Sequence, residues 1–132
     1  MRKLLKKYLL YALGAMCLTG CGTTGKADAA GSVLAPAEYM KMLQSDKKAY
    51  LLDVRRADEY AAGHLPGAAL LDVTDSVAFA RGVELLDKEK NIYIYCRSGR
   101  RSKLAAKQMS EAGYQVTELK GGIGSWQGEV VQ

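Results

Sequence analysis

The stretch YCRSGRRS at positions 95–102 is the residue pattern in this chain that most clearly indicates chemistry. Cys96 ends an apolar run, and a polar loop with a glycine and three arginines separates it from a segment of helical periodicity. The backbone N–H groups of such a loop, the positive end of the following helix and the arginines all favour a thiolate. Together they can lower a cysteine pKa from about 8.5 to about 3.5–7.5. The pattern therefore predicts that Cys96 is a nucleophile.

The six residues that follow Cys96, here called the Cys96 loop, are expected to surround the sulfur. Gly99 permits a tight turn that brings the backbone close to the sulfur, and the arginines attract an anionic substrate. The expected substrate-binding residues are Arg97, Ser98, Gly99, Arg100, Arg101 and Ser102. The alternative is that Cys96 is a buried cysteine that packs as a small apolar residue.

The first 21 residues carry the features of an export signal. A basic start, MRKLLKKY, precedes a short apolar segment, LLYALGAMCL, and the tetrapeptide LTGC at positions 18–21 resembles the lipobox of bacterial lipoproteins. The resemblance implies cleavage before Cys21, acylation of that cysteine and an exported lipoprotein that is anchored to a membrane and faces the periplasm or the cell exterior. We expect a signal peptide at 1–20 and a flexible tether at 21–32. An ordinary signal peptide or an uncleaved anchor is the alternative.

Processing at Cys21 would change both the cysteine count and the charge. The chain has three cysteines, and with Cys17 removed and Cys21 acylated, Cys96 would be the one free thiol. Four of the 19 basic residues lie in the leader, which leaves 15 against 14 acidic residues and a formal charge of +1. This balance argues against nucleic-acid binding. No cysteine or histidine spacing indicates a metal site, and no cofactor is expected.

The rest of the chain, 33–132, is expected to form one domain in which strands and helices alternate. Apolar runs predict strands at 49–54, 69–73, 91–95 and 114–119, and helical patterns lie at 35–44, 58–62, 76–86 and 102–113. In the last helix, Leu104, Ala105, Met109 and Ala112 are expected to face the core, with Ser102 as its cap and Gly113 as its end. The alternation predicts an α/β fold in three layers, with a central, mostly parallel sheet flanked by helices.

Three stretches resemble the motifs of single-domain rhodaneses, a family of sulfurtransferases. They are LLDVRRADEYAAGHLPGA at 51–68, YCRSGRRS at 95–102 and LKGGIGSW at 119–126, in the order in which the family has them. The resemblance implies a rhodanese-like fold and a reaction in which Cys96 takes the outer sulfur of thiosulfate or a persulfide and passes it to cyanide or another thiol. The backbone amides of the Cys96 loop would cradle the persulfide. Asp53 and Arg55 would support the loop, and we expect Asp53 to pair with Arg97.

Two features of the sequence bear on alternative functions. Phosphatases and arsenate reductases that share the fold use a seven-residue motif, C-x-x-x-x-x-R, whereas Arg101 is the sixth residue counted from Cys96, so the loop matches a smaller, sulfur-sized cradle. In two-domain thiosulfate enzymes an arginine tends to precede the tyrosine of the first stretch, but Glu59 does so here, which leaves the donor open. A persulfide-sensing, redox-sensing or partner-binding module without catalysis is a further alternative.

The other polar and aromatic residues of these motifs have structural interpretations. His64 is expected to stabilise its Gly/Pro turn, because a thiolate held by amides needs no base. Asp53 and Glu59 are expected to be ion partners and not acids or bases. Trp126 is expected to pack beneath the Cys96 loop.

Overall fold

The structure, a computed structural model, describes residues 31–132. The predicted signal peptide, the acylation site at Cys21 and nearly all of the predicted tether lie outside the described residues. Within residues 31–132, no helix is both long and apolar enough to cross a membrane.

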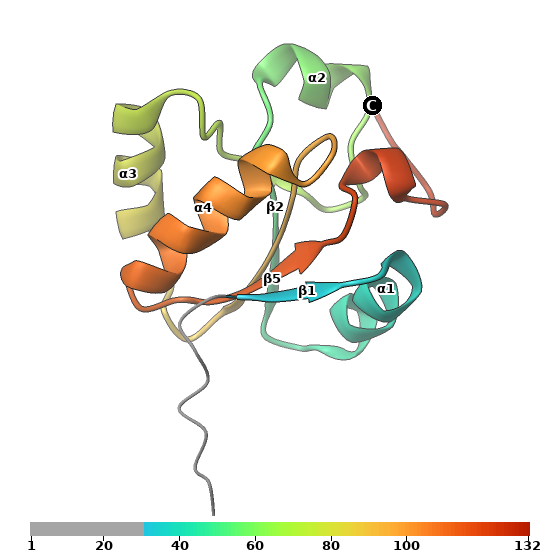
Figure 1. The fold of residues 1–132 in the computed structure, drawn as a ribbon, viewed down its shortest axis with the longest axis horizontal. Coiled ribbons are helices and arrows are strands. Elements are labelled where there is room, and N and C mark those ends of the chain that lie inside the picture. The colour runs from blue at the N-terminus through green and yellow to red at the C-terminus, as the bar shows by residue number, and fades with distance from the viewer. Residues whose placement is uncertain (1–30) are drawn as a thin grey trace, which may run out of the picture.

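A five-stranded sheet forms the centre of the fold, and its strand pairs are all parallel (Figure 1). The strands lie in the order β1-β5-β4-β2-β3, with the bounds β1 Ser32–Leu34, β2 Ala49–Asp53, β3 Ala69–Leu70, β4 Asn91–Tyr95 and β5 Gln115–Leu119. β2 and β4 pair along their full lengths. Their β-branched and aromatic residues suit central strands that are buried on both faces.

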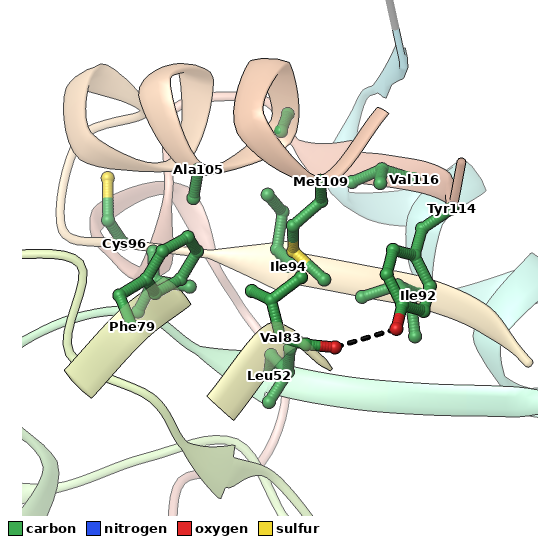
Figure 2. Packing of buried hydrophobic residues seen from close by; sticks show 12 residues of the cluster. Leu52, Phe79, Val83, Ile92, Ile94, Cys96, Ala105, Met109, Tyr114 and Val116 are labelled. Carbon is green, nitrogen blue, oxygen red and sulfur yellow. Dashed lines mark hydrogen bonds between the residues drawn. The ribbon is translucent and has the colours of Figure 1, made fainter. Parts of the chain in front are cut away.

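Helices cover both faces of the sheet, which confirms the predicted three-layer α/β fold. Their bounds are α1 Pro36–Ser45, α2 Ala57–Ala62, α3 Ser76–Glu84, α4 Arg100–Glu111 and a 3₁₀ helix, η1, Ile123–Ser125. Side chains of β4 alternate between the faces. Ile92 and Ile94 pack with α3 and α4 (Figure 2), whereas Tyr93 and Tyr95 join the cluster that contains α1 and η1 residues.

Helix α4 begins earlier than predicted, and of its predicted core residues Ala105 and Met109 are confirmed. Gly99 precedes its first residue with φ +98°, in the left-handed region that favours glycine, and no side chain caps this end. The predicted cap, Ser102, lies inside the helix and is buried. The buried positions are Ser102, Ala105, Ala106 and Met109, whereas Ala112 is exposed and Leu104 is 59% exposed. The predicted face is wrong at Leu104 and Ala112 because the inward row of the helix includes a serine, which an apolar pattern does not reveal.

Two short strands at the sheet edges also differ from the sequence prediction. β1, which was not predicted, begins at Ser32 inside the predicted tether and pairs in parallel with β5, and the Ser32 Oγ lies 3.1 Å from the Thr117 Oγ1. β3 covers only Ala69–Leu70 of the predicted 69–73. A strand of two or three residues is too short to show a periodic pattern in the sequence. Such a strand is defined by its pairing with a neighbouring strand, which only the structure shows.

Candidate active site

Cys96 lies directly after the central strand β4 and next to the first turn of α4. It is fully buried, at 0% exposure, and belongs to the apolar cluster of β2, β4, α3 and α4. Figure 2 shows its sulfur directed toward the start of α4. The carboxyl end of a central parallel strand, beside a helix N-terminus, is the region where open α/β sheets bind ligands and anions.

Hydrogen-bond donors of the Cys96 loop converge on the sulfur. The Gly99 backbone N–H donates to the Cys96 Sγ over 3.1 Å, and the Sγ lies 3.6 Å from the Ser102 Oγ. Burial raises the pKa of Cys96, but hydrogen bonds with the backbone and hydroxyl of Ser102 and with the backbone of Ser98 and Gly99 outweigh it, so the thiol pKa lies below its ordinary value. The loop therefore favours the nucleophilic thiolate.

The glycine-rich stretch after β5 holds the start of the Cys96 loop through the backbone. The Ile123 N–H donates to the Cys96 carbonyl over 2.8 Å, and the Gly124 N–H donates to the Arg97 carbonyl over 3.0 Å. Gly122 adopts φ +63°, and a Cβ at this position would lie 2.5 Å from backbone atoms of Cys96 and Arg97. Both the conformation and the close approach therefore require glycine at position 122.

Arg101 forms a bidentate ion pair with Glu59 of α2. Its Nη1 and Nη2 lie 2.6 and 2.8 Å from the two carboxylate oxygens. The hydrogen bonds from Arg101 lower the pKa of Glu59 to about 2. Glu59 is thus an ion partner, as predicted, and it occupies the guanidinium of Arg101. Arg97 and Arg100 are exposed, and neither makes a salt bridge within residues 31–132.

Asp53 pairs with Arg55 and not with Arg97, so the predicted partner is wrong. The Arg55 Nη2 lies 2.6 Å from the Asp53 Oδ2, and the Arg55 Nε and backbone N–H both donate to the Oδ1 over 2.9 Å. A second bond of 2.6 Å runs from the Arg55 Nη2 to the Gly63 carbonyl. Because both side chains are buried, this local pair satisfies the carboxylate without Arg97. It ties the end of β2 to the turn after α2.

A buried carboxyl group that sequence reasoning missed, that of Glu118 on β5, lies behind Ser102. The Ser102 Oγ is 3.2 Å from the Glu118 Oε2 and 3.2 Å from the Gly99 carbonyl. Glu118 is 7% exposed, and burial raises the pKa of its carboxyl group. A signal for it existed in the sequence. Glu118 is two residues from Val116, and therefore on the same buried face of β5, where an acid is unusual.

A pocket of about 260 Å³ opens beside Glu118 and the Cys96 loop. Apolar residues, two lysines and two residues of the Cys96 loop contribute to its wall. It is lined by Val33, Ser98, Gly99, Lys103, Glu118, Leu119, Lys120 and Gly121. The pocket therefore brings solvent next to a carboxyl group that is otherwise enclosed by protein.

His64 and Trp126 make structural contacts. The His64 ring stacks on Tyr60 with 3.7 Å between ring centroids, and its Nδ1 donates to the Tyr60 carbonyl over 2.9 Å. Trp126 packs edge-on against Tyr39 in the cluster on the opposite sheet face from Cys96. Its predicted place beneath the Cys96 loop is wrong, because its ring packs with Tyr39 in the cluster that does not contain Cys96.

The fold and the site together define a class of protein, a parallel α/β domain with a buried cysteine beside a tight loop between its central strand and the next helix. The chain belongs to the rhodanese-like domain family, which matches residues 35–129. The match includes β2, β4 and β5, the Cys96 loop and η1.

Individual relatives agree with this assignment. YtwF of Bacillus subtilis, named provisionally as a sulfurtransferase, is 33% identical over 96 residues, which cover 73% of this chain and 90% of YtwF. YrkF of the same species, named provisionally as a sulfur carrier protein, is 32% identical over 69% of this chain and 48% of YrkF.

Solved structures show the same fold. A rhodanese-related protein from Thermoplasma volcanium has a TM-score of 0.67 at 22% identity, covering 76% of this chain and 97% of the other. A rhodanese-like domain protein from Staphylococcus aureus has a TM-score of 0.65 at 26% identity, covering 74% and 93%.

Proposed function

We propose that this protein is a sulfurtransferase that carries a sulfane sulfur on Cys96. The observation that carries the proposal is the convergence of loop hydrogen-bond donors on a buried thiol, whose pKa they lower. A thiolate held in this way is ready to attack a sulfur atom. The same donors suit the negative charge of the persulfide that would form. The sulfurtransferase and sulfur-carrier names of two relatives support this class of reaction.

The proposed reaction consists of two sulfur transfers. The Cys96 thiolate attacks the outer sulfur of the donor; with thiosulfate, the sulfur–sulfur bond breaks, sulfite leaves with the electron pair and Cys96 becomes a persulfide anion. An acceptor then attacks the outer sulfur of this persulfide, and Cys96 leaves as a thiolate. Cyanide would depart as thiocyanate, and an acceptor thiolate would depart as a persulfide.

The arginines of the Cys96 loop would have different roles in this reaction. Arg97 and Arg100 would attract an anionic donor, whereas Arg101 is held by Glu59. The occupation of Arg101 also disfavours the phosphatase and arsenate reductase alternative, which needs a free terminal arginine to clamp an oxyanion. We propose thiosulfate or a persulfide as the donor.

We propose a location for this activity from the sequence features of the N-terminus. The leader 1–20 would direct export, and acylation of Cys21 would anchor the domain to a membrane through the tether. The sulfur donor and the thiol or cyanide acceptor would then be met in the periplasm or at the cell exterior.

The experiment that tests the proposed function is an intact-mass measurement. The protein is incubated with thiosulfate and its intact mass is measured. It is then treated with cyanide and the mass is measured again, with Cys96→Ala as the control. The proposal predicts a gain of one sulfur atom that cyanide removes, and no gain in the control. A stable Cys96 persulfide that no acceptor discharges would favour the sensing or partner-binding alternative. Hydrolysis of aryl phosphates without any sulfur gain would overturn the proposal.

A further inference from the structure

We propose that Glu118 is a positioning residue that accepts the Cys96 proton through the hydroxyl group of Ser102. The proposal deepens the proposed function and rests on it for its catalytic consequence, because Cys96 must lose a proton before it attacks a donor. The proton relay itself is a property of the folded protein that can be measured without any sulfur transfer.

Two consecutive contacts connect the thiol to the carboxyl group. The Cys96 Sγ lies 3.6 Å from the Ser102 Oγ, which is within hydrogen-bonding distance for sulfur, and the Ser102 Oγ lies 3.2 Å from the Glu118 Oε2. All three residues are buried, at 0%, 0% and 7% exposure. In this arrangement the thiol donates to the hydroxyl oxygen. The hydroxyl has two acceptors at 3.2 Å, the Gly99 carbonyl and the Glu118 carboxylate, and in the relay it donates to the carboxylate.

The relay is a concerted transfer of two protons. The S–H proton of Cys96 moves to the Ser102 Oγ while the Ser102 proton moves to the Glu118 Oε2, so Ser102 is unchanged. The products are a thiolate and a neutral carboxylic acid, and the net charge of the site stays the same. After the transfer the Glu118 O–H donates to the Ser102 oxygen and the Ser102 O–H donates to the thiolate, which stabilises the nucleophile.

The surroundings of Glu118 favour such an exchange. Its strand neighbours in the sheet are apolar, Val33 of β1 and Ile94 of β4. The charged groups that share its pocket are Lys103 of α4 and Lys120 at the end of β5. Burial raises the pKa of Glu118 and the loop donors lower that of Cys96, so the two pKa values approach each other. Two groups coupled in this way titrate as a pair.

The pocket of about 260 Å³ gives this relay an outlet to solvent. Glu118 lines the pocket, whereas Cys96 has no exposed surface. A proton taken from Cys96 can therefore leave from Glu118 into the pocket. The buried acid thus has a function that accounts for its place on the apolar face of β5.

The experiment measures the alkylation of Cys96 by iodoacetamide as a function of pH in the full-length protein. Trypsin releases Cys96 in the peptide NIYIYCR, residues 91–97, so mass spectrometry separates its alkylation from that of Cys17 and Cys21. Iodoacetamide is chosen because it is small and Cys96 is buried. The variants are Glu118→Gln, which keeps the shape of the side chain, and Ser102→Ala, which removes the bridging hydroxyl. Glu111→Gln, at the far, exposed end of α4, is the control for the loss of one negative charge.

In the wild-type protein and in Glu111→Gln, the alkylation rate should rise in two steps with pH, because the Cys96 and Glu118 pair loses two protons in turn. Glu118→Gln should show one step, with a midpoint about one pH unit or more below the upper wild-type step, because a nearby negative charge is gone. The alkylation profile of Ser102→Ala should lack the lower step. The midpoint of its remaining step should lie at a higher pH than the upper wild-type step, because the thiolate loses a hydrogen-bond donor while the carboxylate stays.

The lower step of the wild-type profile, lost in both variants, is the signature of the relay, because it reports a thiolate that coexists with a protonated Glu118. The opposite shifts of the remaining step follow from local charge and hydrogen bonding alone. One step in the wild-type protein with an unchanged midpoint in Glu118→Gln would overturn the proposal, and so would a raised midpoint in that variant. If Glu118→Gln does not fold, the alkylation profile of Ser102→Ala tests the relay, because the lower step should be absent from it. Failure of the proposed function would look different. The protein would then show the alkylation profiles expected for the relay but would acquire no sulfur from thiosulfate or persulfides.

Discussion

The ion pair between Glu59 and Arg101 connects α2 to the Cys96 loop, and Glu59→Gln should have opposite effects on stability and on donor binding. The change removes one charge and keeps the shape of the side chain. Stability should fall because Arg101 loses its partner. The use of an anionic donor should improve because Arg101 is released next to the site.

The size of the stability effect follows from the geometry and the pKa of Glu59. Two hydrogen bonds of 2.6 and 2.8 Å lower this pKa from 4.5 to about 2. At about 1.4 kcal/mol for each pKa unit, the upper limit is about 3.5 kcal/mol. Both side chains keep contact with water, at 19% and 26% exposure. Solvent screening should therefore reduce the loss of unfolding free energy to about 1–2 kcal/mol.

The effect should depend on pH in a defined direction. Because the pKa of Glu59 is lower in the folded protein than in the unfolded chain, its stabilising contribution is complete above about pH 4.5. It is lost as the pH falls toward about 2, where the carboxylate becomes protonated. The unfolding free energies of the wild-type protein and Glu59→Gln should therefore converge over this window.

The assays are urea unfolding at several pH values and thiosulfate-dependent formation of thiocyanate. Release of Arg101 should lower the KM for thiosulfate by about two- to fivefold, which corresponds to a partly screened charge contact. Asp58→Asn, which removes an exposed carboxylate that lies 3.4 Å from Arg56, is the matched control. Its stability should stay within about 0.5 kcal/mol of the wild-type value. If Glu59→Gln is no less stable than this control at pH 7, our reasoning about the pair is refuted.

Three further predictions concern the nucleophile, the anchor and the buried pair. Cys96→Ala should abolish sulfur transfer with little change in the melting curve, and turnover by this variant in the thiocyanate assay would contradict the mechanism. Cys21→Ser should block acylation in cells and release the mature domain from the membrane fraction, since stable anchoring needs acyl chains; a cleaved variant that still sediments with membranes would exclude a lipid anchor. Asp53→Asn should cost about 3–5 kcal/mol of unfolding free energy, because it leaves Arg55 buried without its charge partner, and a loss below about 1 kcal/mol in urea unfolding would show that the pair is dispensable.

The local sequence by itself determined most of the secondary structure and the position of the candidate nucleophile. The apolar runs that became β2, β4 and β5 are long enough to show that they are buried, and the alternation with helical patterns predicts a parallel sheet. Cys96 and the six residues of its loop are contiguous, so their common location needs no knowledge of distant contacts. The same pattern placed the loop between a strand and a helix, whereas the central position of that strand comes from the order of the strands in the sheet.

Only the tertiary structure decided which charged and polar side chains become partners. The sequence offers several arginines as partners for Asp53. The bend after β2 brings Arg55 into contact with it. Arg101 meets Glu59 across 42 residues of sequence, and Ser102 meets Glu118 across 16. Hydrogen bonds and ion pairs depend on atomic distances of about 3 Å, and these distances result from how α2, α4 and β5 pack. A sequence pattern shows which residues are buried, but it does not contain the distances that pair them.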